Sequence, residues 1–145
     1  MTQQDRRIRL ISRRLIEAEI SHYHETLQEL QELEEEFTAP TVRDFTEPHI
    51  RSGPSDPTPT KAIQMITSTE LLELRRRVAA IERMLWILKA HPEPERYELI
   101  KLTYWSNGRY SVASICQELN ISESTYHRWK KEALEIVAEK LGWRV

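Results

Sequence analysis

The segment from Ser111 to Lys131, SVASICQELNISESTYHRWKK, constrains the fold of this 145-residue chain more than any other part of it. Its apolar residues are Ile115, Leu119, Ile121, Tyr126 and Trp129. They are separated by four, two, five and three residues, which suits two short helices that meet at a sharp turn and share a small core. The spacing therefore predicts a helix-turn-helix; a helical hairpin inside a larger bundle is the alternative.

The polar residues favour the same division. Ser111 and Ser122 are each placed to cap the start of a helix. Asn120 lies at the predicted turn, where the backbone is expected to be left-handed and asparagine is tolerated. These three residues predict helix boundaries close to 111, 120 and 122.

Two hydrophobic staples are expected at the same boundaries. Tyr110 precedes the first cap and should pack on Ile115, and Ile121 precedes the second cap and should pack on Tyr126. Cys116 is expected at the close contact between the helices, where a small residue fits. A redox role for this cysteine is the weaker interpretation.

Composition places the chain among soluble proteins rather than membrane or disordered ones. It is 39% hydrophobic and 30% charged, and no apolar run approaches the length of a membrane span, so no membrane partner is expected. The first residues lack the apolar core of a signal peptide, and the single cysteine allows no disulfide framework within the chain. Both features predict a cytoplasmic protein.

Charge is distributed unevenly along the chain. Residues 1–15 hold five Arg and one Asp, a net charge of +4, whereas residues 16–37 hold eight Glu and no Lys or Arg, a net charge of −8. The segment from Ser124 to Lys131 is basic and contains no acid. A DNA-binding surface needs such a local basic face, even in a chain whose net charge is −2.

The N-terminal part predicts long helices. Residues 3–37 contain no Pro or Gly and are expected to form one long helix with a coiled-coil-like seam. The apolar residues of this seam are Ile16, Ile20, Tyr23, Leu27, Leu30 and Phe37, with Glu34 filling the one gap.

Residues 38–60 hold five prolines and predict a linker or extended loop. A second helix is expected from near Thr60 to the His91-Pro92 break, with Thr67 and Glu70 as a capping box where the helix could restart. Its predicted seam comprises Leu71, Leu74, Val78, Ile81, Leu85 and Leu88. The two long helices can form an antiparallel hairpin or pair between subunits, and the sequence leaves both open.

After Pro94 the pattern predicts three further helices. Residues 95–105 form a supporting helix, and a Ser106-Asn107-Gly108 turn precedes the helix capped by Ser111. The last helix should run from Glu123 to about Leu141 and end at Gly142, with Trp143 folding back. The expected fold is all-α, with a helical oligomerisation or interaction region at 1–91 and a helix-turn-helix DNA-binding domain at 92–145.

The second helix of such a motif inserts its N-terminal part into the major groove, so its outward residues are the expected base readers. These are Glu123, Ser124, His127, Arg128 and Lys131. The expected phosphate contacts are Arg109, Ser111, Thr125 and Lys130. The spacing of Tyr126 and Trp129 predicts core positions rather than base stacking.

An enzyme is not expected. The three glycines form no phosphate-binding loop, and no nucleophile with a neighbouring base is evident, so neither a catalytic residue nor a cofactor is predicted. His22 and His24 lie two apart on a helix and face different directions, so no metal site is predicted.

With these motifs placed, the chain resembles the RinA/ArpU-like family of phage late-gene transcriptional activators, whose DNA-binding end is similar to region 4 of bacterial sigma factors. The matching segments are Tyr23-His24-Glu25-Thr26, Gly53-Pro54-Ser55-Asp56-Pro57-Thr58, and Ile115 to Trp129 followed by Lys130-Lys131-Glu132. The resemblance covers nearly all of the chain.

The resemblance implies a sequence-specific regulator of double-stranded DNA that activates phage packaging and structural genes in the bacterial host, with host RNA polymerase as a candidate partner. A homo-oligomer is also expected, a dimer foremost, because one helix-turn-helix reads only a few base pairs. Two other functions remain open: a small terminase-like DNA-packaging subunit, and a protein-interaction module that does not read DNA.

Overall fold

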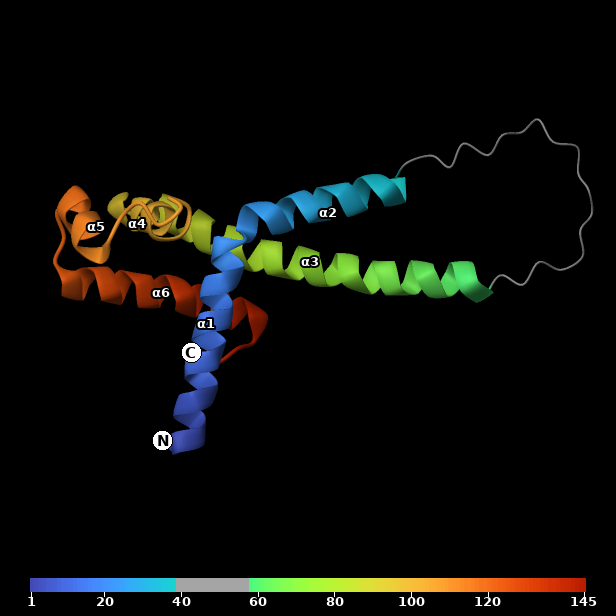
Figure 1. Cartoon of the computed structure of the whole chain (residues 1–145), viewed down its shortest axis with the longest axis horizontal. Helices are drawn as coiled ribbons and strands as arrows, with labels where there is room; N and C mark the ends of the chain where they lie inside the picture. The colour runs from blue at the N-terminus through green and yellow to red at the C-terminus, as the bar shows by residue number, and fades with distance from the viewer. Residues whose placement is uncertain (39–57) are drawn as a thin grey trace, which may run out of the picture.

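The computed structural model describes residues 1–38 and 58–145, and all of the regular structure in these two ranges is helical (Figure 1). The helices are α1 (Gln3–Ser21), α2 (Tyr23–Thr38), α3 (Thr58–Ala90), α4 (Glu95–Tyr104), α5 (Val112–Leu119) and α6 (Glu123–Leu141). The prediction of an all-α fold is confirmed. Most of the proline-rich loop predicted at 38–60, and all of the 53–58 motif except Thr58, lies outside the described residues.

The prediction of one long helix over residues 3–37 is wrong, because the chain bends at His22 and forms two helices. The indole Nε1 of Trp105 donates to the Ile20 carbonyl at 2.8 Å, and the Ser21 hydroxyl donates to the Glu17 carbonyl at 2.9 Å. Side-chain donors of this kind occupy carbonyls that the helix backbone would otherwise use, which bends a helix. The bend lets α1 pack on α6 and α4 while α2 packs on α3.

Helices α2 and α3 lie side by side and run in opposite directions, which is the hairpin alternative left open by the sequence (Figure 1). Every predicted seam residue of α3 is buried, and α3 runs through Thr67 and Glu70 without the break that was considered there. The α2 seam is buried or half-buried as far as Leu30, but Phe37 remains 43% exposed, so its predicted place in the seam is wrong.

The hydrophobic core is continuous from the hairpin into the C-terminal helices. Helix α6 packs along α3, and the buried residues of α1, Ile16 and Ile20, belong to the same core as Tyr126 and Leu134 of α6. Contacts therefore cross the boundary predicted between residues 91 and 92. None of the helices in the described ranges is long and apolar enough to cross a membrane.

Candidate nucleic-acid interface

Helices α5 and α6 form the predicted helix-turn-helix, with both starts capped as expected. The Ser111 Oγ accepts from the Ser114 amide at 3.1 Å, and the Ser122 Oγ accepts from the Thr125 amide at 3.1 Å. Asn120 ends α5 in the left-handed conformation, with φ of 54° and ψ of 48°. These local interactions set the angle at which α6 leaves α5.

The apolar contacts beside the caps agree with the sequence only in part. Ile121 is half-buried and packs on the core, and Cys116 is half-buried there too, as predicted. Tyr110 is 41% exposed and lies outside this core, so the staple from Tyr110 onto Ile115 stays a prediction.

The far end of α6 is closed by a left-handed glycine. Gly142 has φ of 72°, and the Trp143 amide donates to the Ala138 carbonyl at 2.9 Å, so the chain turns back and Trp143 packs on the core. This is the geometry of a Schellman cap and was predicted from the sequence. Both ends of the recognition helix are thus fixed.

The structure places the five predicted base readers together on the outer face of α6. Glu123, Ser124, His127, Arg128 and Lys131 are all exposed. Between them lie Tyr126, 2% exposed, and Trp129, 7% exposed, which are core residues as predicted. Helical periodicity therefore separates an outer polar face from an inner apolar face within one element.

Charges on this outer face are partly paired. The His127 Nε2 lies 3.6 Å from the Glu123 carboxylate, and the Lys131 ammonium lies 3.8 Å from that of Glu135. Arg128 has no ion-pair partner among the residues described. Its guanidinium is therefore the cation of this face most available to a ligand.

Three of the four predicted phosphate contacts are accessible. Arg109 and Ser111 are exposed beside the start of α5, and Thr125 is half-exposed in the first turn of α6. The Ser111 hydroxyl is already engaged in its cap, as is that of Thr125, which accepts from Ser122 at 2.9 Å. Arg109 is the member of this group whose charge reaches solvent.

Lys130 differs from the other predicted residues because it faces α1. Its ammonium lies 2.7 Å from the Glu17 carboxylate, and its side chain is only 19% exposed. The Tyr104 hydroxyl donates to the same carboxylate at 2.9 Å. Burial on its own would raise the pKa of Glu17, but the hydrogen bonds from Lys130 and Tyr104 lower it below its usual value. Lys130 thus fixes α1 against the recognition helix.

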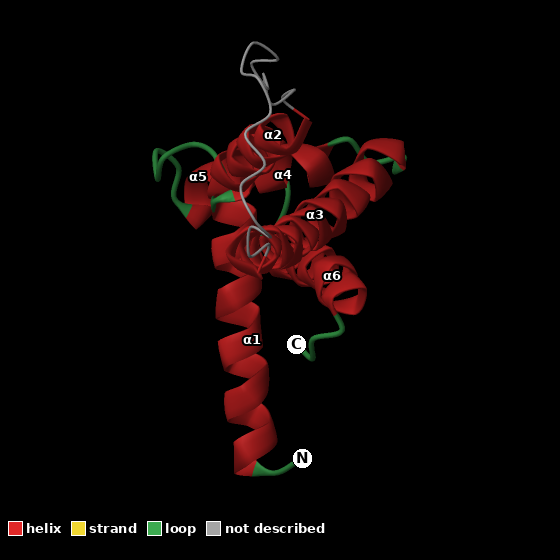
Figure 2. Cartoon of the chain, turned by 90° about the vertical axis from the view of Figure 1, so that its right-hand side faces the viewer, coloured by secondary structure: helices red, strands yellow, loops and turns green. Residues whose placement is uncertain are grey.

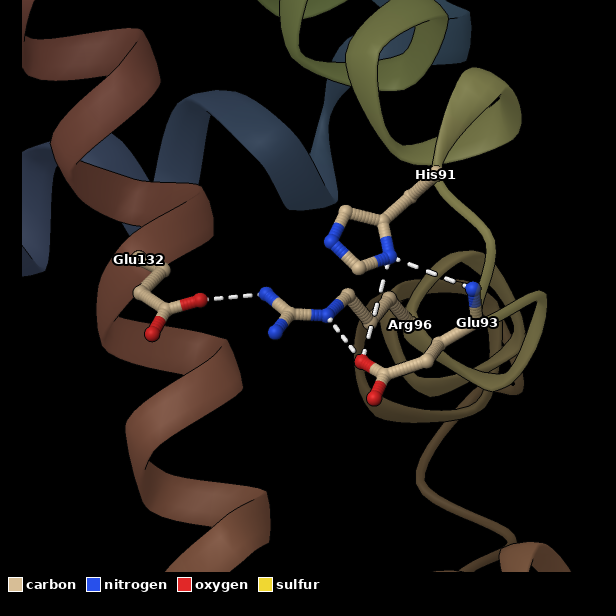
Figure 3. Close-up of polar contacts among 4 residues, drawn as sticks. All are labelled: His91, Glu93, Arg96 and Glu132. Atoms are coloured by element: carbon tan, nitrogen blue, oxygen red, sulfur yellow. Dashed lines mark hydrogen bonds and ion pairs between the residues drawn. The ribbon is translucent and has the colours of Figure 1, made fainter.

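A second polar cluster holds α4 against the recognition helix (Figure 3). Arg96 donates from Nε to Glu93 at 2.8 Å and from Nη1 to Glu132, and its guanidinium lies 4.9 Å from the centre of the Trp129 ring. Burial would lower the pKa of Arg96, but the hydrogen bonds to Glu93 and Glu132 raise it overall. Sequence reasoning missed this cluster, and its members in α4 and α6 are 36 residues apart.

A third contact joins α4 to α6 inside the motif. The hydroxyl groups of Thr103 and Tyr126 lie 3.2 Å apart, so the polar end of a buried ring is satisfied from the supporting helix. Among residues 1–38 and 58–145 no group of His, Cys, Asp and Glu is arranged to hold a metal ion.

Comparison with known proteins gives two matches. A helix-turn-helix family described as "Transposase" matches residues 91–140, the segment that contains α4, α5 and most of α6. Over 98% of this chain and 99% of the relative, the sequence is 28% identical to "Transcriptional activator rinA" of Staphylococcus phage phi11. No solved structure shows a significant match. The resemblance to RinA-like proteins is confirmed over nearly the whole chain.

Proposed function

We propose that this protein is a sequence-specific regulator of transcription that binds double-stranded DNA through α6. The observation that carries the proposal is the outer face of α6, where five polar side chains are exposed on a helix that is capped at both ends and packs against α1, α3, α4 and α5. A rigid helix that presents such side chains suits the major groove, whose base edges offer hydrogen-bond partners.

The reading residues have distinct roles in this proposal. Arg128 donates two hydrogen bonds to a guanine, and the Glu123 carboxylate accepts from a cytosine amino group. Ser124, His127 and Lys131 contact neighbouring bases. Arg109 and the capped start of α5 bind phosphates and set the register of the helix on the duplex.

Lys130, expected from the sequence to bind a phosphate, has a different role in the proposal. Its ammonium group is already bound to Glu17, and moving it to DNA would leave that carboxylate without its cation. Lys130 therefore positions α6 relative to α1.

The proposed effect on transcription is taken from the relative that matches this chain over nearly its whole length. RinA of phage phi11 is named a transcriptional activator, and the similarity to it extends across the hairpin as well as the DNA-binding motif. We propose the same output here: activation of phage late genes for packaging and structural proteins in the cytoplasm of a bacterial host, with host RNA polymerase as the partner. No catalytic step is assigned to the chain.

Two copies are expected to act together. One recognition helix contacts only a few base pairs, so affinity and specificity for one promoter require two half-sites. A dimer that spaces two α6 helices by one turn of DNA would supply them. The helices outside the DNA-binding motif are available for this pairing.

The test is selection from a pool of randomised duplexes, run with the wild-type protein, Arg128→Ala and Arg83→Ala at two salt concentrations. Arg83 is an exposed arginine on α3, outside the helix-turn-helix, and controls for the loss of one charge. We expect the wild type and Arg83→Ala to enrich one motif and Arg128→Ala to lose or relax it, by about 1–3 kcal/mol at one base pair.

Recovery of DNA without any motif, weakened equally by salt in all three proteins, would overturn the proposal. Binding would then be only electrostatic, as in a packaging subunit. Failure to recover DNA at moderate salt would instead indicate a protein-interaction module.

A further inference from the structure

The N-terminal half of α1 projects away from the rest of the molecule (Figures 1 and 2). Its side chains include Ile8, 48% exposed, Ile11, 58% exposed, and Leu15, 50% exposed. These residues are spaced by three and four positions, so they form one apolar stripe along the helix. The stripe lies on a different side of α1 from the buried Ile16 and Ile20. Ile8 borders a cavity of about 220 Å³ that Arg144 also lines, and even so each of the three stripe residues is about half exposed.

The same helix carries five arginines at positions 6, 7, 9, 13 and 14. Within the part of the chain that the structure describes, no ion pair joins any of them to a carboxylate. The neighbouring basic cluster of α3 behaves differently, because Arg75, Arg76 and Arg77 each pair with a glutamate. Asp5 acts on Arg9, and Glu17 on Arg13, only through space. The arm, defined here as residues 2–15, therefore combines a net charge of +4 with exposed apolar surface.

The hairpin presents the opposite charge. A cavity of about 250 Å³ is lined by four carboxylates and one leucine: Glu29, Glu32, Leu33, Glu36 and Glu70. A second cavity of about 280 Å³ shares Glu29 but is mixed in charge, because Arg77 lines it together with Glu19, its ion-pair partner, and His22 lines it together with Glu25. The first cavity is therefore the acidic groove of the hairpin, and Phe37, which follows Glu36 in the sequence, is 43% exposed.

We propose that the arm of one copy docks in the acidic groove of a second copy. The arginines then face the glutamates, and the apolar stripe covers Leu33 and Phe37. At 1.5 Å per residue the arm is about 20 Å long and α2 about 24 Å, so the two match in length. Within one chain the bend at His22 directs the arm away from α2, so its own groove is out of reach (Figure 2).

Opposite charge and apolar contact together favour this occupant. DNA would neutralise the arginines, but it would leave the stripe of Ile8, Ile11 and Leu15 in water. The inference rests on the proposed pairing of two copies and not on the reading of bases. If docking is reciprocal, the interface is the same on both copies and closes as a dimer.

The test is a charge exchange, measured by sedimentation of the full-length protein without DNA. One variant carries Arg7→Glu and Arg14→Glu, on the edge of the apolar stripe; the other carries Glu29→Lys and Glu36→Lys, in the groove. Arg83→Glu is the matched control on an exposed position of α3. Circular dichroism establishes that each variant is folded.

We expect the wild type and Arg83→Glu to self-associate, and each double variant to associate at least about tenfold more weakly, because two Arg→Glu changes lower the net charge of the arm from +4 to 0 and two Glu→Lys changes bring the four groove carboxylates from −4 to 0. An equimolar mixture of the two double variants should regain association, since one junction of the mixed dimer is wild-type and in the other the introduced glutamates meet the introduced lysines. This recovery cannot arise from damaged folding of either variant.

A mixture that stays monomeric, or a wild type that is monomeric at micromolar concentration, would overturn the proposal. So would unchanged association of the arm variant with a lost affinity for DNA, which would make the arm a phosphate contact. Base reading is tested separately by Arg128→Ala, so this proposal can fail while the proposed function stands.

Discussion

Helices α1 and α6 have the same length, 19 residues each, but they differ in how much of their surface is buried. Helix α6 buries seven residues and is capped by Ser122 and Gly142, whereas α1 buries only Ile16 and Ile20 and projects over its first half. The comparison shows how this fold separates two tasks. A helix that reads DNA has to be held at a fixed angle, whereas a helix that docks on another molecule has to leave its surface uncovered.

The largest expected difference between the two helices is in the cost of removing an apolar side chain. Tyr126→Ala should lower the free energy of unfolding by about 3–5 kcal/mol, because the ring is 2% exposed and its hydroxyl is bonded. Ile11→Ala should change it by less than about 0.5 kcal/mol in dilute protein. Urea denaturation followed by circular dichroism measures both.

The same pair of variants sharpens the comparison when protein concentration is raised. Docking of the arm stabilises the folded chain by mass action, so the cost of Ile11→Ala should grow with concentration and that of Tyr126→Ala should be large throughout. A large cost of Ile11→Ala even in dilute protein would show that α1 is held within its own chain.

The next largest effect is expected at the cluster that positions α6. Arg96→Met keeps much of the apolar stem but leaves Glu132 and Glu93 without their cation, and should cost about 1–3 kcal/mol of stability. Affinity for the selected DNA should fall as well, since the angle of α6 is less defined. Arg83→Met is the control, and equal losses in both variants would show that the cluster has no positioning role.

The contrast between local and distant contacts also decides what the sequence could predict. The caps at Ser111 and Ser122, the left-handed Asn120 and the Gly142 stop are interactions between residues at most five apart, so their residue types carry the signal. The seam of α3 was predicted for the same reason, because its period lies within one helix. The five base readers follow from the periodicity of α6.

Contacts between segments that are distant in the sequence have no comparable pattern of residue types or spacing. The bond from Trp105 to the Ile20 carbonyl spans 85 residues, and it accompanies the bend that sequence reasoning missed at His22. Lys130 was expected at DNA because it lies in a basic run. Its position four residues after the buried Tyr126 was a sign that it flanks the core, but its partner Glu17 could be found only from the fold.

A smaller effect compares the two N-terminal caps. Ser122→Ala removes the acceptor of the Thr125 amide in the packed motif and should cost about 1 kcal/mol of global stability. Thr2→Ala removes the capping box that Thr2 forms with Asp5, yet it should only fray the first turn of the arm. Amide hydrogen exchange distinguishes the two, because fraying raises exchange in the first residues of α1 alone. Faster amide exchange throughout α6 in Thr2→Ala would contradict the prediction that the Thr2 cap acts only on the first turn of α1.

The smallest expected effect is in the pH dependence of the contact between the two helices. The pKa of Glu17 is lower in the folded chain than its usual value of 4.5, so its contribution to stability is fully present above that value and is lost as the pH falls through the folded-state pKa. Glu17→Gln should therefore lie closest to the wild type in the acid range and fall furthest below it near neutral pH. Glu118→Gln, an exposed position in α5, is the control and should follow the wild-type curve. Denaturation midpoints measured from neutral to acid pH decide the matter, and parallel curves for the wild type and Glu17→Gln would mean that the Lys130 ion pair does not hold α1 on α6. In that case the arm would be anchored by Ile16, Ile20, the Trp105 bond and the Arg77–Glu19 ion pair, and the fixed angle of the recognition helix would depend on α3, α4 and α5.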